Sequence, residues 1–328
     1  MNILMNIDEN PCLMRLIFRV DASPNTGTGH VMRCSAIIEE ATSRGISSVV
    51  IGKLGGYPWL EERLKNVGAQ HLEDSKFFQI NKDEDVLVID SYDLPVTEAF
   101  IQPQNWKSVI SIADDVTPDY FATLVIHPGI DLFLNKMNAN KILAGADFIP
   151  FRKSIRKSMR PKGAFVNKVV IFAGGTDAFN FALALAIELK EIQDFESAVF
   201  FSSSSEIAAL DPRFRVRNFG AALDEELECA DLVFTSASTS SLEIIAREIP
   251  VGICFTVNNQ VSYYHALISN GLALGIGNFS QSKNWKLDRM VIEKLFTDAS
   301  LRGKLSSSSS NFLDLLGSQR IVNEILSL

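Results

Sequence analysis

Residues 15–45 read RLIFRVDASPNTGTGHVMRCSAIIEEATSRG, and this stretch decides the fold at the start of the chain. Its first six residues form an apolar run of strand length, and the following DASPNTGTGH is rich in turn-forming residues. From Val31 onward apolar residues recur at helical spacing until Gly45, which ends the helix. The stretch predicts a strand, a glycine-rich loop and a helix, the repeating unit of parallel α/β sheets.

The same unit recurs near residue 168, where KVVIFA is followed by the loop GGTD and a helix over 178–189. Other apolar runs have strand length, at residues 47–51, 86–90, 108–113, 123–126, 197–201, 214–216, 232–235 and 252–255. Helical periodicity lies between many of them, at residues 59–67, 224–229, 241–247 and 263–270, and in the tail from residue 288. The alternation predicts an α/β fold in which two Rossmann-like domains face a central cleft.

The length supports two domains, because 328 residues exceed what one core usually holds. We expect residues 1–14 to be an extension, 15–163 a first Rossmann-like domain and 164–328 a second. The basic stretch 153–162 suits the connection between them. The last helix could pack back on the first domain. The serine run 306–310 is expected to form a turn and a helix cap.

The composition excludes several classes of protein. Asp and Glu outnumber Lys and Arg by 39 to 31, and the net charge of −8 argues against a broad nucleic-acid or anionic-membrane surface. The four cysteines are far apart and form no CxxC pair, which favours a reducing cytoplasm. The first fourteen residues do not have the pattern of a signal peptide, and no apolar run reaches about 18 residues. We therefore expect a cytoplasmic protein without membrane insertion.

The glycine loop before the first helix is the first candidate site. Gly27 and Gly29 allow close backbone approach, and His30 falls where helix amides and the helix dipole favour an anion. The alternative is a plain turn with His30 as helix cap. Asp21 could orient His30 or the substrate, or accept amide hydrogen bonds in its own loop. Arg33 could contact phosphate or form a solvated salt bridge.

Two segments of the second half are candidate phosphate sites. The backbone of Gly174, Gly175 and Thr176 could cradle phosphate oxygens, or form an ordinary turn before a helix. Hydroxyls cluster around the start of a later helix, at Thr235, Ser236, Ser238, Thr239, Ser240 and Ser241. With the helix amides they suit a diphosphate, whereas capping explains only one or two of them. Glu243 could accept ribose hydroxyls, or interact with the helix dipole.

A few more polar residues follow predicted strands or precede helices. Tyr92 could face the cleft, whereas Asp114 and Asp115 could serve it or cap their loop. Asn259 and Gln260 could hydrogen-bond a sugar or a phosphate. The histidines have no metal-ligand spacing, and dinucleotide, P-loop, GxSxG and HExxH patterns are missing. We therefore expect no metal and no cofactor.

In these motifs the chain resembles the UDP-sugar hydrolases of the pseudaminic acid pathway and the related spore-coat-polysaccharide biosynthesis proteins. The resemblance covers about residues 15–325. Its most specific part is R-x-D-A-S…G-x-G-H-x-x-R-C, from Arg19 to Cys34. The other motifs keep the same order, namely I-D-x-Y (89–92), DD (114–115), GGTD (174–177), S-A-S…E (236–243) and NQ (259–260).

The resemblance implies the two-domain fold of MurG-type glycosyltransferases, the glycosyltransferase B fold. It implies hydrolysis of UDP-2,4-diacetamido-2,4,6-trideoxy-β-L-altropyranose to UDP and free sugar without a metal. It places the catalytic histidine at His30 and a tyrosine of the cleft at Tyr92. It also places the uridine diphosphate on the second domain, around Gly175, Ser238, Glu243, Asn259 and Gln260.

Two stretches depart from the family pattern, HPGIDLF at 127–133 and DFIPFRKSIRK at 147–157. Both would lie near the sugar, so the resemblance does not determine which sugar is bound. A glycosyltransferase could use the same donor site, and a nucleotide-sugar-binding protein could use it without chemistry. The presence of His30 argues against the latter. Turnover of the donor without an acceptor separates the hydrolase from both.

Overall fold

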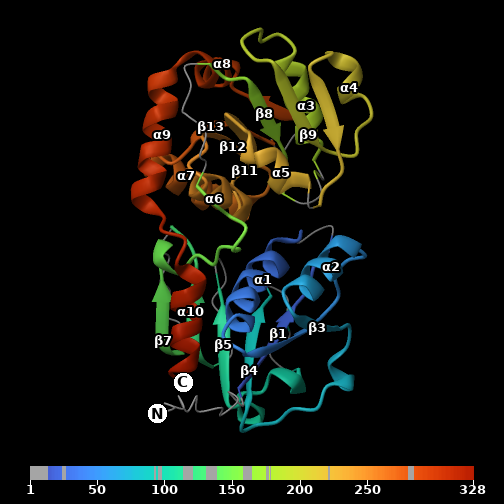
Figure 1. Cartoon of the computed structure of the whole chain (residues 1–328), viewed down its shortest axis with the longest axis vertical. Coiled ribbons are helices and arrows are strands. Elements are labelled where there is room, and N and C mark those ends of the chain that lie inside the picture. The colour runs from blue at the N-terminus through green and yellow to red at the C-terminus, as the bar shows by residue number, and fades with distance from the viewer. Residues whose placement is uncertain are drawn as a thin grey trace, which may run out of the picture.

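The computed structural model describes residues 14–23, 27–91, 94, 98–113, 121–130, 139–157, 165–174, 177, 179–220, 222–279 and 284–328. Figure 1 shows two α/β domains, the lower one formed mainly by the first half of the chain and the upper one by the second. Each contains a parallel or largely parallel sheet, which confirms the predicted fold class. In the part of the chain so described, no helix is both long enough and apolar enough to cross a membrane.

Seven described strands form the first sheet, in the order β3-β2-β1-β4-β5-β6-β7, and all neighbours are parallel. They are β1 (Arg15–Val20), β2 (Ser47–Ile51), β3 (Ala69–Leu72), β4 (Asp85–Asp90), β5 (Ser108–Ile112), β6 (Ala122–His127) and β7 (Ala139–Ala144). The strand order changes direction between β1 and β4. Ligands of such sheets bind beyond the carboxyl ends of the strands at this change.

The second sheet repeats the plan, with seven described strands in the order β10-β9-β8-β11-β12-β13-β14. They are β8 (Lys168–Ile171), β9 (Ser197–Phe201), β10 (Phe214–Arg217), β11 (Leu232–Ser236), β12 (Val251–Phe255), β13 (Leu274–Phe279) and β14 (Trp285–Leu287). Only β14 is antiparallel to its neighbour among these strands. Here the order changes direction between β8 and β11, which marks the corresponding ligand position in this domain.

The helices of the described chain pack against these sheets. They are α1 (Gly29–Thr42), α2 (Pro58–Asn66), α3 (Phe181–Leu189), α4 (Ile207–Leu210), α5 (Ala222–Glu228), α6 (Thr239–Ala246), α7 (Val261–Ser269), α8 (Arg289–Thr297), α9 (Ala299–Phe312) and α10 (Gly317–Leu326). Short 3-10 turns complete the list, namely η1 (Ser75–Phe77), η2 (Ala99–Ile101), η3 (Pro103–Asn105), η4 (Ala146–Phe148) and η5 (Asn258–Gln260).

The last helix, α10, lies in the first domain although it follows α9 of the second. Its residues Ile321, Val322 and Ile325 are buried in the core that α1 and α2 share with the first sheet. In Figure 1, α10 stands beside β7 in the lower domain, and it contacts both α1 and η4. The chain therefore crosses between the domains twice, once after η4 and once between α9 and α10.

Two features differ from the sequence prediction. The outer strands β3, β7, β13 and β14 were not expected, because AQHL, ANKILA, LGIGNF and WKL mix polar residues or glycine with apolar ones. The prediction that the serine run forms a turn is wrong, because these serines lie inside α9. The hydroxyls of Ser307 and Ser309 donate to the carbonyls of Gly303 and Leu305, one turn earlier, so the helix continues through them.

Candidate functional site

The helix α1 begins at the carboxyl end of β1, directly after the glycine loop. Gly27 has a φ of +74°, in the left-handed region that glycine enters without strain. The helix starts at Gly29, and His30 is its second residue. The first amides of an α-helix have no acceptor within the helix, so this end attracts negative charge. His30 therefore lies at an anion-favouring position of the first sheet.

His30 is held by a buried carboxylate from the neighbouring strand. Its Nδ1 atom lies 2.5 Å from Oδ1 of Asp90, the last residue of β4. Arg33, one turn further along α1, binds both oxygens of Asp90 through Nε and Nη2, each at 2.5 Å. The Nη2 atom also lies 3.0 Å from Nδ1 of His30. Because His30 is 7% exposed and Asp90 1%, these three residues, the His30 cluster, form a nearly closed unit.

The charge of Asp90 fixes the state of the imidazole. Burial alone would raise the pKa of Asp90, but the charges of Arg33 and His30 and their hydrogen bonds hold this pKa well below its ordinary value. An ionised carboxylate can only accept, so Nδ1 of His30 carries the proton that faces Asp90, and in the neutral ring Nε2 is the acceptor. Beside them, burial raises the pKa of the Cys34 thiol, which lies 3.5 Å from Asp90.

Asp21 connects two loops and does not contact His30 in the hydrogen bonds described. The residue at Nδ1 of His30 is Asp90, so of the alternatives for Asp21 the one in which it orients His30 is wrong. Asp21 accepts the backbone amide of Lys53 at 2.8 Å and pairs with Arg19 at 2.5 Å. It thereby joins the loop after β1 to the loop after β2. Arg33 forms a salt bridge, as one of its two predictions had it, but the pair is buried rather than solvated.

The serine and threonine cluster lies at the carboxyl end of β11 and the start of α6. Ser236 ends the strand and Thr239 begins the helix. Ser238 and Ser241 form a capping box, in which the Ser238 amide donates to the Ser241 hydroxyl at 3.4 Å; this hydroxyl also donates to the Ser238 carbonyl at 2.7 Å. Capping therefore accounts for two of the hydroxyls, as predicted. Thr239, whose hydroxyl is not part of the capping box, is the first residue of the helix.

The starts of α1 and α6 meet between the domains. A Cβ atom on Gly29, the first residue of α1, would lie 3.8 Å from Oγ1 of Thr239, the first residue of α6. The two helices are in contact with each other. Two positive helix ends thus converge from different domains, with His30 beside them. This meeting point is suited to an anion with two phosphate groups.

The start of α3 is different, although it also follows the central strand of its sheet. Asp177 accepts the backbone amide of Ala182 at 3.3 Å and the hydroxyl of Ser202 at 2.8 Å. Burial raises the pKa of Asp177. Its carboxylate caps α3 and occupies part of the helix end that the sequence offered to phosphate. Gly174 precedes this cap with a φ of +62°, whereas Gly175 and Thr176 lie outside the described residues.

Glu243 belongs to a second charged group, the Arg152 cluster, in which the arginines Arg152 and Arg247 are buried and the carboxylates Asp224 and Glu243 are partly buried. Arg152 reaches Glu243 at 2.6 and 3.1 Å and Asp224 at 2.8 and 3.2 Å. Arg247 adds a contact of 2.6 Å to Asp224. Burial lowers the pKa of Arg152, but the two carboxylates raise it above its ordinary value. Because α6 starts at Thr239, Glu243 lies in the second helical turn, whereas the predicted alternative of an interaction with the helix dipole needs a residue in the first turn.

The other predicted positions are only partly described. Oε1 of Gln260 accepts the amide and hydroxyl of Thr256, at 2.9 and 3.1 Å, which fixes the loop between β12 and α7. The backbone of Asn259 lies in η5 of the same loop. Tyr92, Asp114 and Asp115 lie outside the described residues. Among the residues that are described, no group of three or more His, Cys, Asp or Glu side chains is arranged to hold a metal ion.

Sequence reasoning missed Asp90 and Arg152. Asp90 ends the buried strand VLVID, next to the change of direction in the strand order, and a charged residue there is a signal for a site. The partner could not be predicted, because His30 lies sixty positions away in the sequence. Arg152 lay in DFIPFRKSIRK (147–157), which was noted only as a departure from the family pattern.

No protein-family model matches this sequence, and neither does any curated protein. Solved structures do match along nearly the whole chain. MurG of Acinetobacter baumannii has 14% identity and a TM-score of 0.63, covering 96% of this chain and 100% of that one. S. aureus MnaA in complex with UDP has 11% identity and a TM-score of 0.61, covering 95% and 96%. The spinosyn forosaminyltransferase SpnP has 11% identity and a TM-score of 0.65, covering 96% and 100%.

These likenesses concern the fold, because each identity is low. Both domains and their order along the chain are included, since the matches cover nearly all of each partner. The chain therefore has the two-domain glycosyltransferase B fold that the sequence predicted.

Proposed function

We propose that this chain is a nucleotide-sugar hydrolase. It binds a UDP-linked 2,4-diacetamido-2,4,6-trideoxy hexose where α1 and α6 meet, and it releases UDP and the free sugar. The observation that carries the proposal is the His30 cluster at the start of α1, beside Gly29, on which a Cβ atom would lie 3.8 Å from Oγ1 of Thr239 at the start of α6. A general base and an anion-binding helix end are thereby brought to one place.

The diphosphate is assigned to the second domain. The first amides of α6 and the hydroxyls of Ser236, Ser238 and Thr239 supply its hydrogen bonds. The MnaA structure among the matches was solved with UDP, which supports UDP as a ligand class of this fold. The backbone of Gly174, Gly175 and Thr176 is assigned to the same phosphates, with α3 itself capped by Asp177.

We assign the remaining predicted residues to contacts with the ribose and the sugar. Glu243 accepts ribose hydroxyls, since each of its oxygens can accept more than the bond from Arg152. Asn259 and Gln260 hydrogen-bond the nucleotide or the sugar. Gly27 and Gly29 let the backbone approach the sugar closely, and Tyr92 contacts it, as the resemblance implies. The diacetamido sugar itself rests on the resemblance alone.

The reaction is a displacement at the anomeric carbon. Water forms a bond to this carbon while the bond from the carbon to the β-phosphate oxygen breaks, and the electron pair leaves with UDP. Nε2 of His30 takes the proton of the water, and Asp90 stabilises the imidazolium that results. The helix ends stabilise the charge on departing UDP. Attack from the face opposite UDP inverts the anomeric configuration.

A glycosyltransferase is the second candidate, and the structural matches favour it. They include SpnP, a forosaminyltransferase, and CalG4, the calicheamicin glycosyltransferase. Such an enzyme would use the same donor site and pass the sugar to an acceptor hydroxyl. In that reaction His30 would take the proton of the acceptor instead of water.

The test is UDP release by the wild-type chain from a panel of UDP-amino sugars, without acceptor and with EDTA present. Release with formation of free sugar supports the hydrolase, and the fastest substrate identifies the sugar. NMR of the first product formed reports the anomeric configuration, which should be inverted. If the chain binds the UDP-sugars without releasing UDP, and turns them over only when acceptors are added, the transferase would replace the hydrolase.

A further inference from the structure

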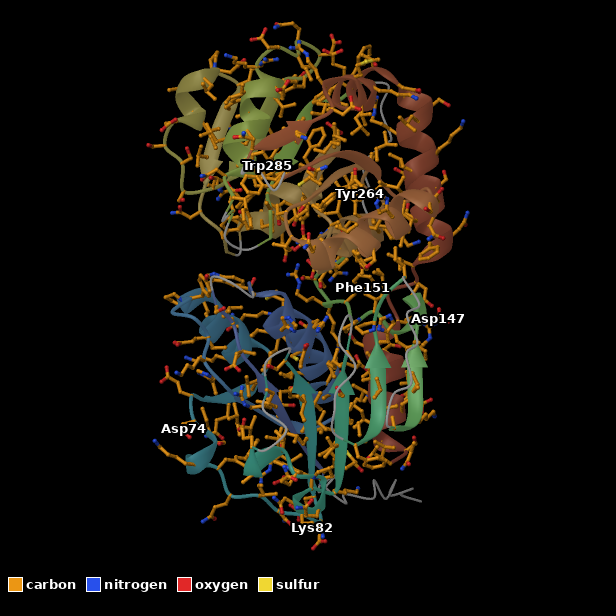
Figure 2. The ribbon with its side chains drawn as sticks, turned by 180° about the vertical axis from the view of Figure 1, so that it is seen from behind. Asp74, Lys82, Asp147, Phe151, Tyr264 and Trp285 are labelled. Atoms are coloured by element: carbon orange, nitrogen blue, oxygen red, sulfur yellow. The ribbon has the colours of Figure 1, made fainter. Side chains whose placement is uncertain are left out.

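The first connection between the domains binds both of the helices that form the candidate site. It leaves η4 and runs through residues 151–154, which we call the strap. Figure 2 shows Phe151 at the junction of the two domains. Two consecutive residues of the strap, Arg152 and Lys153, bind opposite domains. Such a segment can do more than link the domains, because it contacts a defined part of each.

On the second domain, Arg152 binds α6 and α5. Its guanidinium makes two contacts with Glu243 and two with Asp224, and its side chain is only 9% exposed. Ser154 adds a contact of 3.3 Å to Asp224. Glu243 lies about 6 Å along α6 from Thr239, at a rise of about 1.5 Å per residue. The strap therefore binds α6 close to the end that faces α1.

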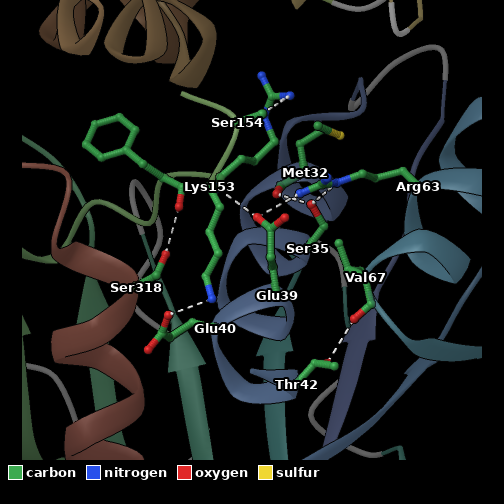
Figure 3. Close-up of polar contacts among 12 residues, drawn as sticks. Met32, Ser35, Glu39, Glu40, Thr42, Arg63, Val67, Lys153, Ser154 and Ser318 are labelled. Atoms are coloured by element: carbon green, nitrogen blue, oxygen red, sulfur yellow. Dashed lines mark hydrogen bonds and ion pairs between the residues drawn. The ribbon is translucent and has the colours of Figure 1, made fainter. Parts of the chain in front are cut away.

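On the first domain, Lys153 binds α1, as Figure 3 shows. Its backbone amide donates to Oε2 of Glu39 at 2.7 Å, and its ammonium lies 3.3 Å from Glu40. Glu39 also accepts from Arg63 of α2, at 3.2 Å. Glu39 lies about 13 Å along α1 from His30. The helix that carries the candidate base is thus gripped by the same strap.

The strap is itself fixed by the start of α10. The hydroxyl of Ser318 donates to the carbonyl of Phe151 at 3.1 Å. Gly317 lies so close to the carbonyl of Ile149 that a Cβ atom would come within 2.0 Å of the oxygen. Only glycine allows this approach. Both crossings between the domains therefore meet at the strap.

We propose that the strap sets the register between the starts of α1 and α6, and that Glu39 and Arg152 are positioning residues for the reaction. The inference rests on the proposed function, since it concerns the same site. Glu39 acts on His30 through α1, and Arg152 orients Glu243 and α6. A base displaced by about 1 Å from a reacting atom can cost about 100-fold in rate. The contact of the strap with Glu39 of α1 therefore affects turnover, whereas its contact with Glu243 of α6 affects nucleotide binding.

The test compares Glu39→Ala with Arg63→Met. Both remove the pair between Glu39 and Arg63, but only Glu39→Ala removes the acceptor of the strap. Glu39→Ala should lower kcat for UDP release by about tenfold or more, with the Kd for UDP within about threefold of wild type. Arg63→Met should keep kcat within about threefold. Equal losses of kcat in both variants, or an unchanged kcat in Glu39→Ala, would overturn the proposal.

A distance measurement keeps the inference separate from the proposed function. Spin labels at the exposed positions 62 and 208 report the spacing of the domains, in a chain whose Cys12 and Cys229 are replaced by serine. Glu39→Ala should broaden the distance distribution, and Lys157→Met should not, because Lys157 binds only Glu248 and Ser310 of the second domain in the contacts described. An unchanged distribution in Glu39→Ala would contradict the strap, whatever reaction the chain catalyses.

Discussion

The His30 cluster and the Arg152 cluster both pair arginine with carboxylates, but only the first contains a histidine, and its carboxylate is the more deeply buried. Asp90 binds an arginine and a histidine, whereas Asp224 binds two arginines. A histidine can change its charge between about pH 5 and 8, and an arginine cannot. The first cluster can therefore move a proton. The second can only hold its partners in place.

Their positions in the fold agree with this difference. The His30 cluster joins the carboxyl end of β4 to the first turn of α1, where strand order changes direction. The Arg152 cluster joins α5 and α6 to the strap, behind the helix end that faces the first domain. A site between two domains needs both functions, because a base on one domain can react only when the other domain holds the substrate at a fixed distance from it.

The largest difference is expected from the same substitution in each cluster. Asp90→Asn leaves Arg33 as a buried cation without its carboxylate and removes the charge that stabilises the imidazolium. UDP release should fall by at least about 100-fold, and the free energy of unfolding by about 3–5 kcal/mol. Asp224→Asn should lower stability without a comparable fall in release, because Arg152 keeps Glu243. Similar release rates in the two variants would erase the distinction between the clusters.

The pH dependence of stability sharpens the comparison. The pKa of Asp90 is lower in the folded chain than the ordinary value of about 3.9. Its ionised form therefore stabilises the fold above about pH 3.9, and this stabilisation is lost as the pH falls towards the folded pKa. Urea unfolding measures the free energy of unfolding of wild type and of Asp90→Asn. The difference between the two should be the same at about pH 7 and pH 5 and smaller at about pH 3.5. A difference independent of pH would exclude the charge of Asp90 as its origin.

A smaller effect is expected from Arg152→Met, which removes the shared cation of the second cluster. Glu243 then loses two hydrogen bonds and its fixed orientation. The Kd for UDP should rise about tenfold, in keeping with about 1.4 kcal/mol of binding free energy. Isothermal titration would measure it, with Arg320→Met as the matched surface control. Unchanged UDP affinity in a folded Arg152→Met chain would remove Glu243 from the nucleotide site.

The smallest difference separates the two helix starts of the second domain. Thr239→Val removes a hydroxyl at the first residue of α6, and the Kd for UDP should rise about threefold to tenfold. Asp177→Ala removes the cap of α3, and stability should fall by about 0.5–2 kcal/mol with little change in this Kd. Titration and thermal unfolding of both variants check the pair. A stronger loss of UDP binding in Asp177→Ala would move the diphosphate to α3.

The sequence predicted the elements that are apolar and local. VLVID and LVFT are buried on both sides of their sheets, so an apolar run reveals them, and Gly45 marks the end of α1. The outer strands, such as AQHL, are partly exposed and have no such pattern. The start of α1 and its histidine were also predictable, because the glycine loop and the helix are neighbours in the chain.

The contacts between distant segments could not be predicted in the same way. Nothing local indicates that Asp90, rather than Asp21, reaches His30, because strand order decides which strand adjoins β1. The same holds for Gly29 and Thr239, which meet only through the packing of two domains. The bond from the Ser202 hydroxyl to Asp177 was hidden for a related reason, because Ser202 lies in the loop after β9.

The central claim is that His30 is the base at the meeting point of α1 and α6. The most direct test is single-turnover UDP release by His30→Ala, with His265→Ala, an exposed histidine of α7, as control. His30→Ala should release UDP at least about 100-fold more slowly than wild type, with the Kd for UDP within about threefold, and His265→Ala should match wild type. Release by His30→Ala at the wild-type rate would contradict the account.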